Sequence, residues 1–274
     1  MSDRGPVWDG EGRDPWMPAR LAAFYEAAKV EAAMFRSFLG FMRDWIGLVR
    51  ERMRENRYDP TTVFGLVPLW YEAMNEFGAE QIYPATEQAY LDTTGEERMP
   101  VDMAALASAR VWQRTNQLKE FPNELYSFIQ AAVDRAITDG WAGPRLAAAI
   151  DAILDMSQTP RWENRAAVVA RTESIGALNG GRNDAFTTVA QQLGGPFERV
   201  WVATMFGPSA ENTRPTHRKA DGQRSPVGGL FTVGDAMLAY PGDPTGPAAE
   251  VIQCRCTTVL VRPGQSLDVS RRRS

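Results

Sequence analysis

One long segment with helical periodicity dominates the first part of the chain. Between Pro18 and about Arg57 the sequence is rich in Ala, Leu, Met, Arg and Glu. Its apolar residues are spaced as on one face of an α-helix: Leu21, Phe24, Tyr25, Ala28, Met34, Phe35, Phe38, Leu39, Met42, Trp45, Ile46, Val49 and Met53. Pro60 disfavours helical backbone at Asp59 and ends the helix. A helix of this length needs something to pack on, so the pattern predicts a helical bundle, a docking surface for another protein, or both.

The helical pattern continues to residue 193 and then stops. Further helices are expected at 63–92, 101–119, 121–140, 141–157 and 162–193. Pro84 should kink or break the first of them. The stretch "FERVWVATM" then alternates and is β-branched, which predicts a strand, and shorter strands are expected in "GLFTV" and "CTTVLV". The fold class is therefore α+β, mainly α, with long N-terminal helices followed by a small α+β domain with long ordered loops.

Four regions follow from these changes in pattern. Residues 1–15 are polar and rich in Gly and Pro, so they are expected to form a flexible arm. A helical region at 16–160 and an α+β region at 161–262 come next. The chain closes with a basic tail at 263–274, whose "RRR" cluster is expected to be solvated.

Composition excludes several classes of protein. With 44% hydrophobic and 23% charged residues, the chain is not mainly disordered. A net charge of −4 gives no reason to expect a protein that coats DNA. The first residues carry mixed charge and lack the apolar region of a signal peptide, so none is expected. No apolar run approaches the roughly 18 to 20 residues of a membrane span. We expect a protein made in the cytoplasm with reduced thiols, and no disulfide between its two cysteines, which are separated by a single residue.

The residues best able to bind a metal all lie in one short C-terminal stretch. His217, the only histidine, lies in "NTRPTHRKADGQ", where Pro215 and Gly222 predict turns. Cys254 and Cys256, the only cysteines, lie in "VIQCRC". Imidazole nitrogen and thiolate sulfur are the ligands that zinc prefers. These residues therefore either form a site or stabilise the fold.

Five motifs occur in order over about 95 residues: "ARTESIGALNGGRNDAF", "VWVATM", "NTRPTHRKADGQ", "FTVGDAMLAYPGDP" and "EVIQCRC". Together they resemble the phage Mu protein F-like head morphogenesis family, the minor capsid proteins of tailed phages. The resemblance implies a structural protein of the virion, not an enzyme, made in the host cytoplasm. It also implies contacts with the portal and major capsid proteins, with phage DNA and self-association as further candidates, and a role in head assembly and in genome packaging or ejection. Some relatives carry toxin or enzymatic domains, and none is expected here because the sequence ends soon after the motifs.

The motif residues allow a structural and a functional interpretation. The set consists of Arg171, Thr172, Glu173, Asn179, Arg214, Pro215, His217, Asp221, Gly222, Pro241, Gly242, Asp243 and Arg255. In the structural interpretation, Arg171 and Glu173 make charge-assisted hydrogen bonds to loop backbone. The "YPGDP" stretch reads as a rigid bend in which the Asp243 carboxylate accepts hydrogen bonds. In the functional interpretation these residues contact a partner or nucleic acid.

Catalysis and metal binding are the sharper alternatives. His217 and Asp221 are four residues apart, so in a helical turn the carboxylate could orient the imidazole as half of a general base. With Cys254 they would suit a metal-dependent hydrolase or a protease of capsid maturation, although no HExxH motif and no nucleophile elbow are present.

The resemblance implies a four-ligand zinc set in some relatives, and Arg214 and Val251 stand here at two of its positions. The candidate zinc ligands that remain in this chain are His217, Cys254 and either Cys256 or Asp221. Otherwise His217 hydrogen-bonds to Asp221 or to a loop carbonyl. Cys254 is then buried, Arg255 points to the other side of a strand, and Arg214 takes the place of the lost metal.

The large aromatic residues of the N-terminal region are expected mainly in the core. They are Trp16, Trp45, Trp70, Tyr71 and Trp112. The same residues would serve as anchors if the helices dock on the portal or on a second copy.

Overall fold

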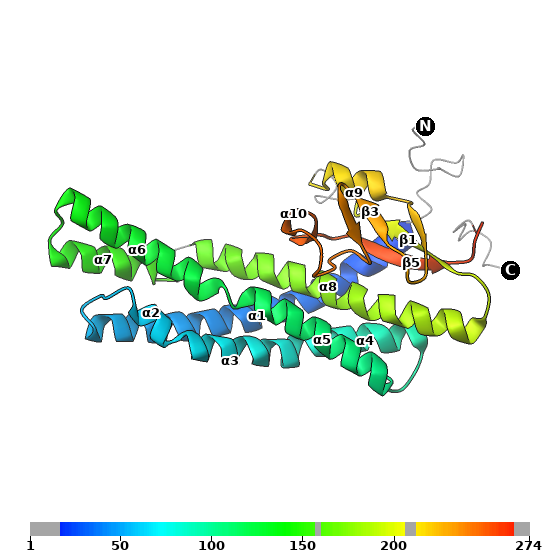
Figure 1. Ribbon diagram of the computed structural model, residues 1–274, viewed down its shortest axis with the longest axis horizontal. Helices are drawn as coiled ribbons and strands as arrows, with labels where there is room; N and C mark the ends of the chain where they lie inside the picture. Colours follow the sequence, from blue (N-terminus) through cyan, green and yellow to red (C-terminus); the bar gives the residue numbers. More distant parts are fainter. Residues whose placement is uncertain (1–16, 157–159, 206–211, 266–274) are drawn as a thin grey trace.

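The computed structural model describes residues 17–156, 160–205 and 212–265. It shows an elongated bundle of helices with a small module of strands and short helices on one side, towards one end (Figure 1). The predicted arm at 1–15 and all but the first residues of the predicted tail at 263–274 lie outside the described residues. Among the helices that the structure describes, none is long and apolar enough to cross a membrane.

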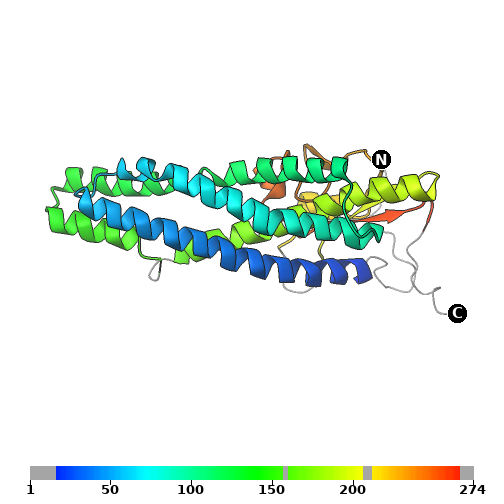
Figure 2. The ribbon, with the colours of Figure 1, turned by 90° about the horizontal axis from the view of Figure 1, so that it is seen from below.

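Two helices run along most of the bundle. Helix α1 (Met17–Glu55) packs against α8 (Pro160–Leu193), and α4 (Tyr83–Thr94) also packs on α8. Figure 2 shows α1 on the outside of the bundle, following its long axis. The remaining helices are α2 (Thr62–Gly65), α3 (Val67–Phe77), α5 (Val101–Leu118), α6 (Phe121–Asp139) and α7 (Gly143–Ile153). The fold is therefore mainly helical, as the periodicity predicts.

Three buried tryptophans organise the centre of the bundle. The indole N–H of Trp45 donates to the carbonyl of Leu66 at 2.8 Å. Trp70 donates to the carbonyl of Leu118 at 3.0 Å, and Trp162 donates to that of Ile153 at 3.0 Å. All three carbonyls lie at the C-terminal end of a helix, where backbone acceptors lack partners within the helix. Each ring therefore fills the core and also satisfies a helix end.

The prediction that the large aromatic residues lie in the core is confirmed for Trp45 and Trp70 and wrong for Trp112. The Trp112 side chain is 64% exposed on α5, and Tyr71 is 41% exposed on α3. Helix periodicity alone does not fix which side of a short helix faces the bundle, because α5 contacts its neighbours on one side only. Trp16 lies outside the described residues.

The segment 63–92 differs from the single kinked helix predicted for it. It consists of α2, α3, the π-helix η1 (Gly78–Ile82) and α4. Pro84 lies in the first turn of α4, directly after the wide π turn. The chain therefore passes Pro84 without a break.

The module contains two small antiparallel sheets. One has the order β2-β1-β5, formed by β1 (Glu198–Val202), β2 (Arg224–Pro226) and β5 (Thr257–Val261). The other is a hairpin of β3 (Phe231–Val233) and β4 (Ala236–Leu238), and the short helices are α9 (Pro215–Ala220) and α10 (Ala248–Val251). The sequence pattern predicts β1, β3 and β5 but not β2 and β4. Strand β5 lies against both α8 and α1.

Helix α8 is shared between the two parts of the molecule. Its first half contributes Trp162, Ala166, Val169 and Ala170 to the main core of the bundle. Its middle lies under the module, whose own core contains Trp201, Phe231, Val233, Leu238, Cys254 and Cys256. The motif region thus lies at the junction of bundle and module.

Candidate functional site

The "ARTESIGALNGG" motif forms the buried middle of α8. Small residues are required there because other groups approach the helix closely. A Cβ atom at Gly176 would lie 2.0 Å from the guanidinium of Arg114, and one at Gly181 would lie 2.1 Å from the carbonyl oxygen of Thr86. The glycines therefore allow both α4 and an arginine of α5 to pack directly on the α8 backbone.

Glu173 bonds to a side chain of α5 and not to loop backbone as predicted. The Arg114 guanidinium donates to the Glu173 carboxylate at 3.1 Å and also donates to the carbonyl of Gly242 in the "YPGDP" loop. Burial alone would lower the pKa of Arg114, but the charge of Glu173 raises it above its ordinary value. The arginine thus remains charged and connects α5, α8 and the loop.

Arg171 likewise bonds to side chains and not to loop carbonyls. Its guanidinium donates to Glu31 of α1 at 3.2 Å and to the side-chain oxygen of Gln253 at 2.8 Å. The neighbouring Thr172 hydroxyl accepts the backbone N–H of Gln253 at 3.1 Å. The two motif residues therefore hold the turn that precedes Cys254.

Asn179 uses both ends of its side chain to hold the module. Its amide nitrogen donates to the carbonyl of Pro241 at 3.0 Å and to that of Cys256 at 2.9 Å, and its oxygen accepts the Thr257 hydroxyl at 3.0 Å. The loop beyond Pro241 is closed by Asp243, whose carboxylate accepts the backbone N–H groups of Ala239 and Thr245 at 2.9 and 3.0 Å. Asn179 therefore ties both the loop after β4 and the start of β5 to α8.

The predicted His217–Asp221 pair does not form. Helix α9 ends at Ala220, and Asp221 leaves it with extended backbone, so the two side chains do not share a helical face. Asp221 instead accepts Arg20 of α1 at 2.7 Å and the backbone N–H of Ala203 at 2.8 Å. Both side chains of the Arg20–Asp221 pair are almost fully buried. This pair is an ionic link between bundle and module.

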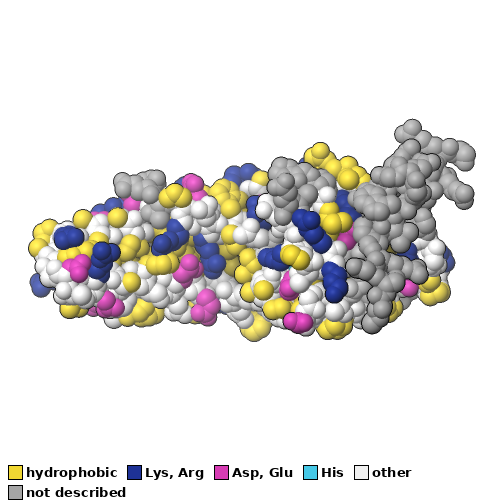
Figure 3. Space-filling model, turned by 90° about the horizontal axis from the view of Figure 1, so that it is seen from above, with side chains coloured by type: hydrophobic (Ala, Val, Ile, Leu, Met, Phe, Trp, Pro, Cys, Tyr) yellow, Lys and Arg dark blue, Asp and Glu magenta, His cyan; other side chains and the backbone are white. Residues whose placement is uncertain are grey.

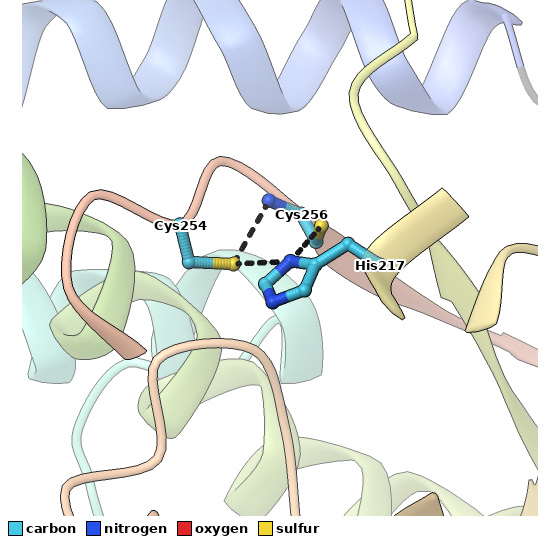
Figure 4. A group of neighbouring side chains, drawn as sticks. All are labelled: His217, Cys254 and Cys256. Atoms are coloured by element: carbon cyan, nitrogen blue, oxygen red, sulfur yellow. Dashed lines mark hydrogen bonds between the residues drawn. The ribbon is translucent and has the colours of Figure 1, made fainter. Parts of the chain in front are cut away.

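His217 faces the two cysteines, as Figure 4 shows. Its Nδ1 lies 3.2 Å from the Cys256 sulfur and 3.6 Å from the Cys254 sulfur, while its Nε2 lies 3.0 Å from the Glu250 carboxylate. The two cysteines lie on one side of the chain because they are two residues apart, and both are free thiols. Arg255 between them points to α1, where it lies 3.5 Å from Glu31.

The environment shifts the acid–base properties of this cluster. A hydrogen bond with Cys256 lowers the pKa of the Cys254 thiol, whereas burial raises the pKa of the Cys256 thiol well above its usual range. Burial alone would lower the pKa of His217, but its contacts with Cys256 and Glu250 raise it. Of the two thiols, that of Cys254 therefore loses its proton first.

A pocket of about 480 Å³ lies beside the cluster. His217, Cys254 and Cys256 line it together with Thr204, Thr213 and three arginines, Arg171, Arg214 and Arg255. Arg214 donates to the carbonyl of Ile252 and so closes the turn before the cysteines. The pocket therefore combines thiols, an imidazole and guanidinium groups.

Sequence reasoning missed the partners that complete these contacts. Arg20 and Arg114 belong to no motif, and Glu250 opens the "EVIQCRC" motif but is not one of the motif residues singled out above. Each lies far along the chain from the residue that it binds. Only the position of Glu250 four residues before Cys254 offered a signal, since a carboxylate beside a metal-capable pair often supports a histidine.

The fold and the buried motif residues define a protein whose buried polar groups hold a small module on a helical bundle. Residues 127–259 match the family described as phage Mu protein F like protein, and the match begins within α6, ahead of residue 161. The match covers just under half of the chain, and this region is therefore similar to a family of phage head morphogenesis proteins that are mainly structural.

A curated relative is the NAD(+)--arginine ADP-ribosyltransferase EFV of Enterococcus faecalis (strain ATCC 700802 / V583). It is 30% identical over 128 residues, which cover 42% of this chain and 24% of the relative. The chain thus spans about a quarter of that protein's length. No solved structure matches the chain.

Proposed function

We propose that this chain is a minor capsid protein of a tailed phage that binds the portal and acts in head assembly, with a part in genome packaging or ejection. The observation that carries the proposal is the family domain together with the use of its motif residues. Glu173, Asn179, Asp221 and Asp243 all bond to other parts of the same chain. Such residues maintain a rigid shape and are not free to act on a substrate.

The surface of the bundle suits contacts with other virion proteins. Several large apolar side chains are exposed there, among them Val101 at 88%, Ile137 at 76% and Trp112 at 64%. On the face drawn in Figure 3, basic and acidic side chains are interspersed with apolar ones and no single basic stripe is visible. This favours the portal and major capsid proteins, or a second copy, over DNA as partners.

The test is quantitative mass spectrometry of proheads and virions made with and without a functional copy of the gene. We expect the chain in both particles, at a number of copies tied to the portal ring, and assembly defects in its absence. Co-expression with the portal protein should yield a complex on size-exclusion chromatography, with a tail protein of the same genome as the control. Normal proheads without the chain would refute the proposal.

Deletion of the first 60 residues is not a suitable test. Helix α1 supplies Met34, Phe38, Met42 and Trp45 to the main core, so its removal would unfold the bundle whatever its partners are. Point substitutions of exposed residues, such as Trp112→Ser, keep the core intact and are preferred.

The name of the curated relative provides a second candidate function, ADP-ribosyl transfer. The proposal assigns the shared 128 residues to the structural role and leaves the transferase activity to the rest of that protein. Incubation of the purified chain with labelled NAD⁺ and an arginine-containing acceptor should therefore give no transfer. The hydrolase alternative loses its His217–Asp221 pair, since Asp221 bonds to Arg20.

A further inference from the structure

Three metal-binding side chains converge at the junction of α9 and the segment before β5. The Nδ1 atom of His217 and the sulfur atoms of Cys254 and Cys256 all lie within 4.8 Å of one another, and all three residues are buried. A tetrahedral zinc ion with Zn–N and Zn–S bonds of usual length separates its nitrogen and sulfur ligands by about 3.6 Å. The measured Nδ1–Sγ distances are 3.2 and 3.6 Å. The three atoms thus stand close to the spacing that a shared ion requires.

The hydrogen bond on the far side of the imidazole selects the tautomer that can bind a metal. Nε2 of His217 lies 3.0 Å from a carboxylate oxygen of Glu250, and that same oxygen accepts the Thr216 hydroxyl at 2.8 Å. A carboxylate in this position holds the proton on Nε2, which leaves the lone pair of Nδ1 directed at the two sulfur atoms. Carboxylates support metal-bound histidines in this way.

The turn that presents Cys254 is held in an unusual conformation. Gln253 has a φ of 59°, in the left-handed region that non-glycine residues seldom adopt. Its backbone N–H is bound by Thr172 and its side chain by Arg171, both from α8. The backbone N–H of Cys256 in turn lies 3.4 Å from the Cys254 sulfur, as in turns that stabilise a thiolate ligand. Strain of this kind persists only where the surroundings hold it, and it is concentrated at functional sites.

We propose that His217, Cys254 and Cys256 bind one zinc ion through Nδ1 and the two thiolates. The fourth position is filled from the adjoining pocket by water or a small anion. With water in the fourth position, two thiolates and a neutral imidazole balance the charge of Zn²⁺, so the ion and its ligands carry no net charge. Each thiol releases its proton on binding. The rings of Trp201 and His217 pack at right angles, with their centroids 5.8 Å apart. The ion joins α9 to the C-terminal strand.

Metal analysis of the full chain tests this inference directly. The protein is purified with a reductant and without chelator, and its zinc content is measured by mass spectrometry. The zinc-free protein is then titrated with Co²⁺, whose absorption reports both tetrahedral geometry and bonds to thiolate. We expect one equivalent of zinc and a tetrahedral, thiolate-ligated cobalt spectrum. A folded protein with both thiols reduced that binds neither ion overturns the proposal. Thiol counting before the titration shows that both cysteines are reduced, so that earlier oxidation does not account for the result.

Matched variants separate ligation from general destabilisation. Cys256→Ser and His217→Asn should abolish stoichiometric binding, and Glu250→Gln should weaken it by about 10- to 100-fold. Phe231→Leu, which loosens the same small core without touching a ligand, should keep the full equivalent of metal. Should the ligand variants fail to fold, the cobalt spectrum of the unaltered chain still decides. Metal content is measured apart from incorporation into proheads, so either proposal can fail alone.

Discussion

The buried pair of Arg114 and Glu173 should be a costly polar contact to break. Its side chains are only 3% and 4% exposed, and their charged atoms are 3.1 Å apart. Glu173→Gln preserves the shape of the side chain but leaves the guanidinium charge buried without a counter-charge. Removal of one partner from such a pair costs about 3–5 kcal/mol of the free energy of unfolding.

The same reasoning predicts that the loss is not additive. Arg114→Met alone strands the Glu173 carboxylate and should cost a similar amount. In the double variant Arg114→Met, Glu173→Met no charge is left buried, and the main remaining penalty is the unpaired carbonyl of Gly242, about 1–3 kcal/mol. The double variant should therefore be more stable than either single variant, with a coupling energy of at least about 2 kcal/mol.

Urea unfolding followed by circular dichroism measures all three variants on the same scale. The control is Glu55→Gln, which removes the partner of Arg52 at a comparable 2.9 Å on the surface, where both side chains are more than half exposed. That substitution should change stability by less than about 0.5 kcal/mol. Equal effects at the two sites, or additive losses in the double variant, would refute the argument from burial.

Two further predictions concern packing and pH. Gly176→Ala places a Cβ atom against the Arg114 guanidinium and should destabilise the folded protein by about 1–3 kcal/mol. Gly47→Ala lies on the exposed side of α1 with open space around it, and it should stabilise the protein by up to about 1 kcal/mol. Thermal unfolding of the two variants checks both signs. Burial alone would raise the pKa of Asp151, but hydrogen bonds from Arg54 and Arg50 lower this pKa below the ordinary 3.8. A carboxylate whose pKa is lowered in the folded state stabilises the folded protein at pH values above 3.8, and this stabilisation is lost as the pH falls through the folded-state pKa. The Asp151→Asn variant should therefore be less stable than the unaltered chain at pH 7 and equally stable in strong acid. A difference that persists in acid would count against the ionic origin.

The helical half of the fold could be read from the sequence because its signals are local. The apolar stripe from Leu21 to Met53 predicts α1 without knowledge of any partner, since the period of a helix is set by its own backbone. The same holds for the start of β1 and for the turn chemistry around Asp243. It does not hold for β2 and β4, which form only because β1 and β3 lie beside them.

For the candidate site, the sequence alone identified the residues, and the tertiary structure decided their partners. The only histidine and the only two cysteines could be singled out by counting. Their arrangement depends on Glu250 and not on Asp221, because α9 ends one residue too early for a contact between His217 and Asp221. Asp221 pairs with Arg20 across 201 residues, and Glu173 pairs with Arg114 across 59. Such pairs form through space once α1, α5 and α8 have packed, and no local pattern in the chain records them.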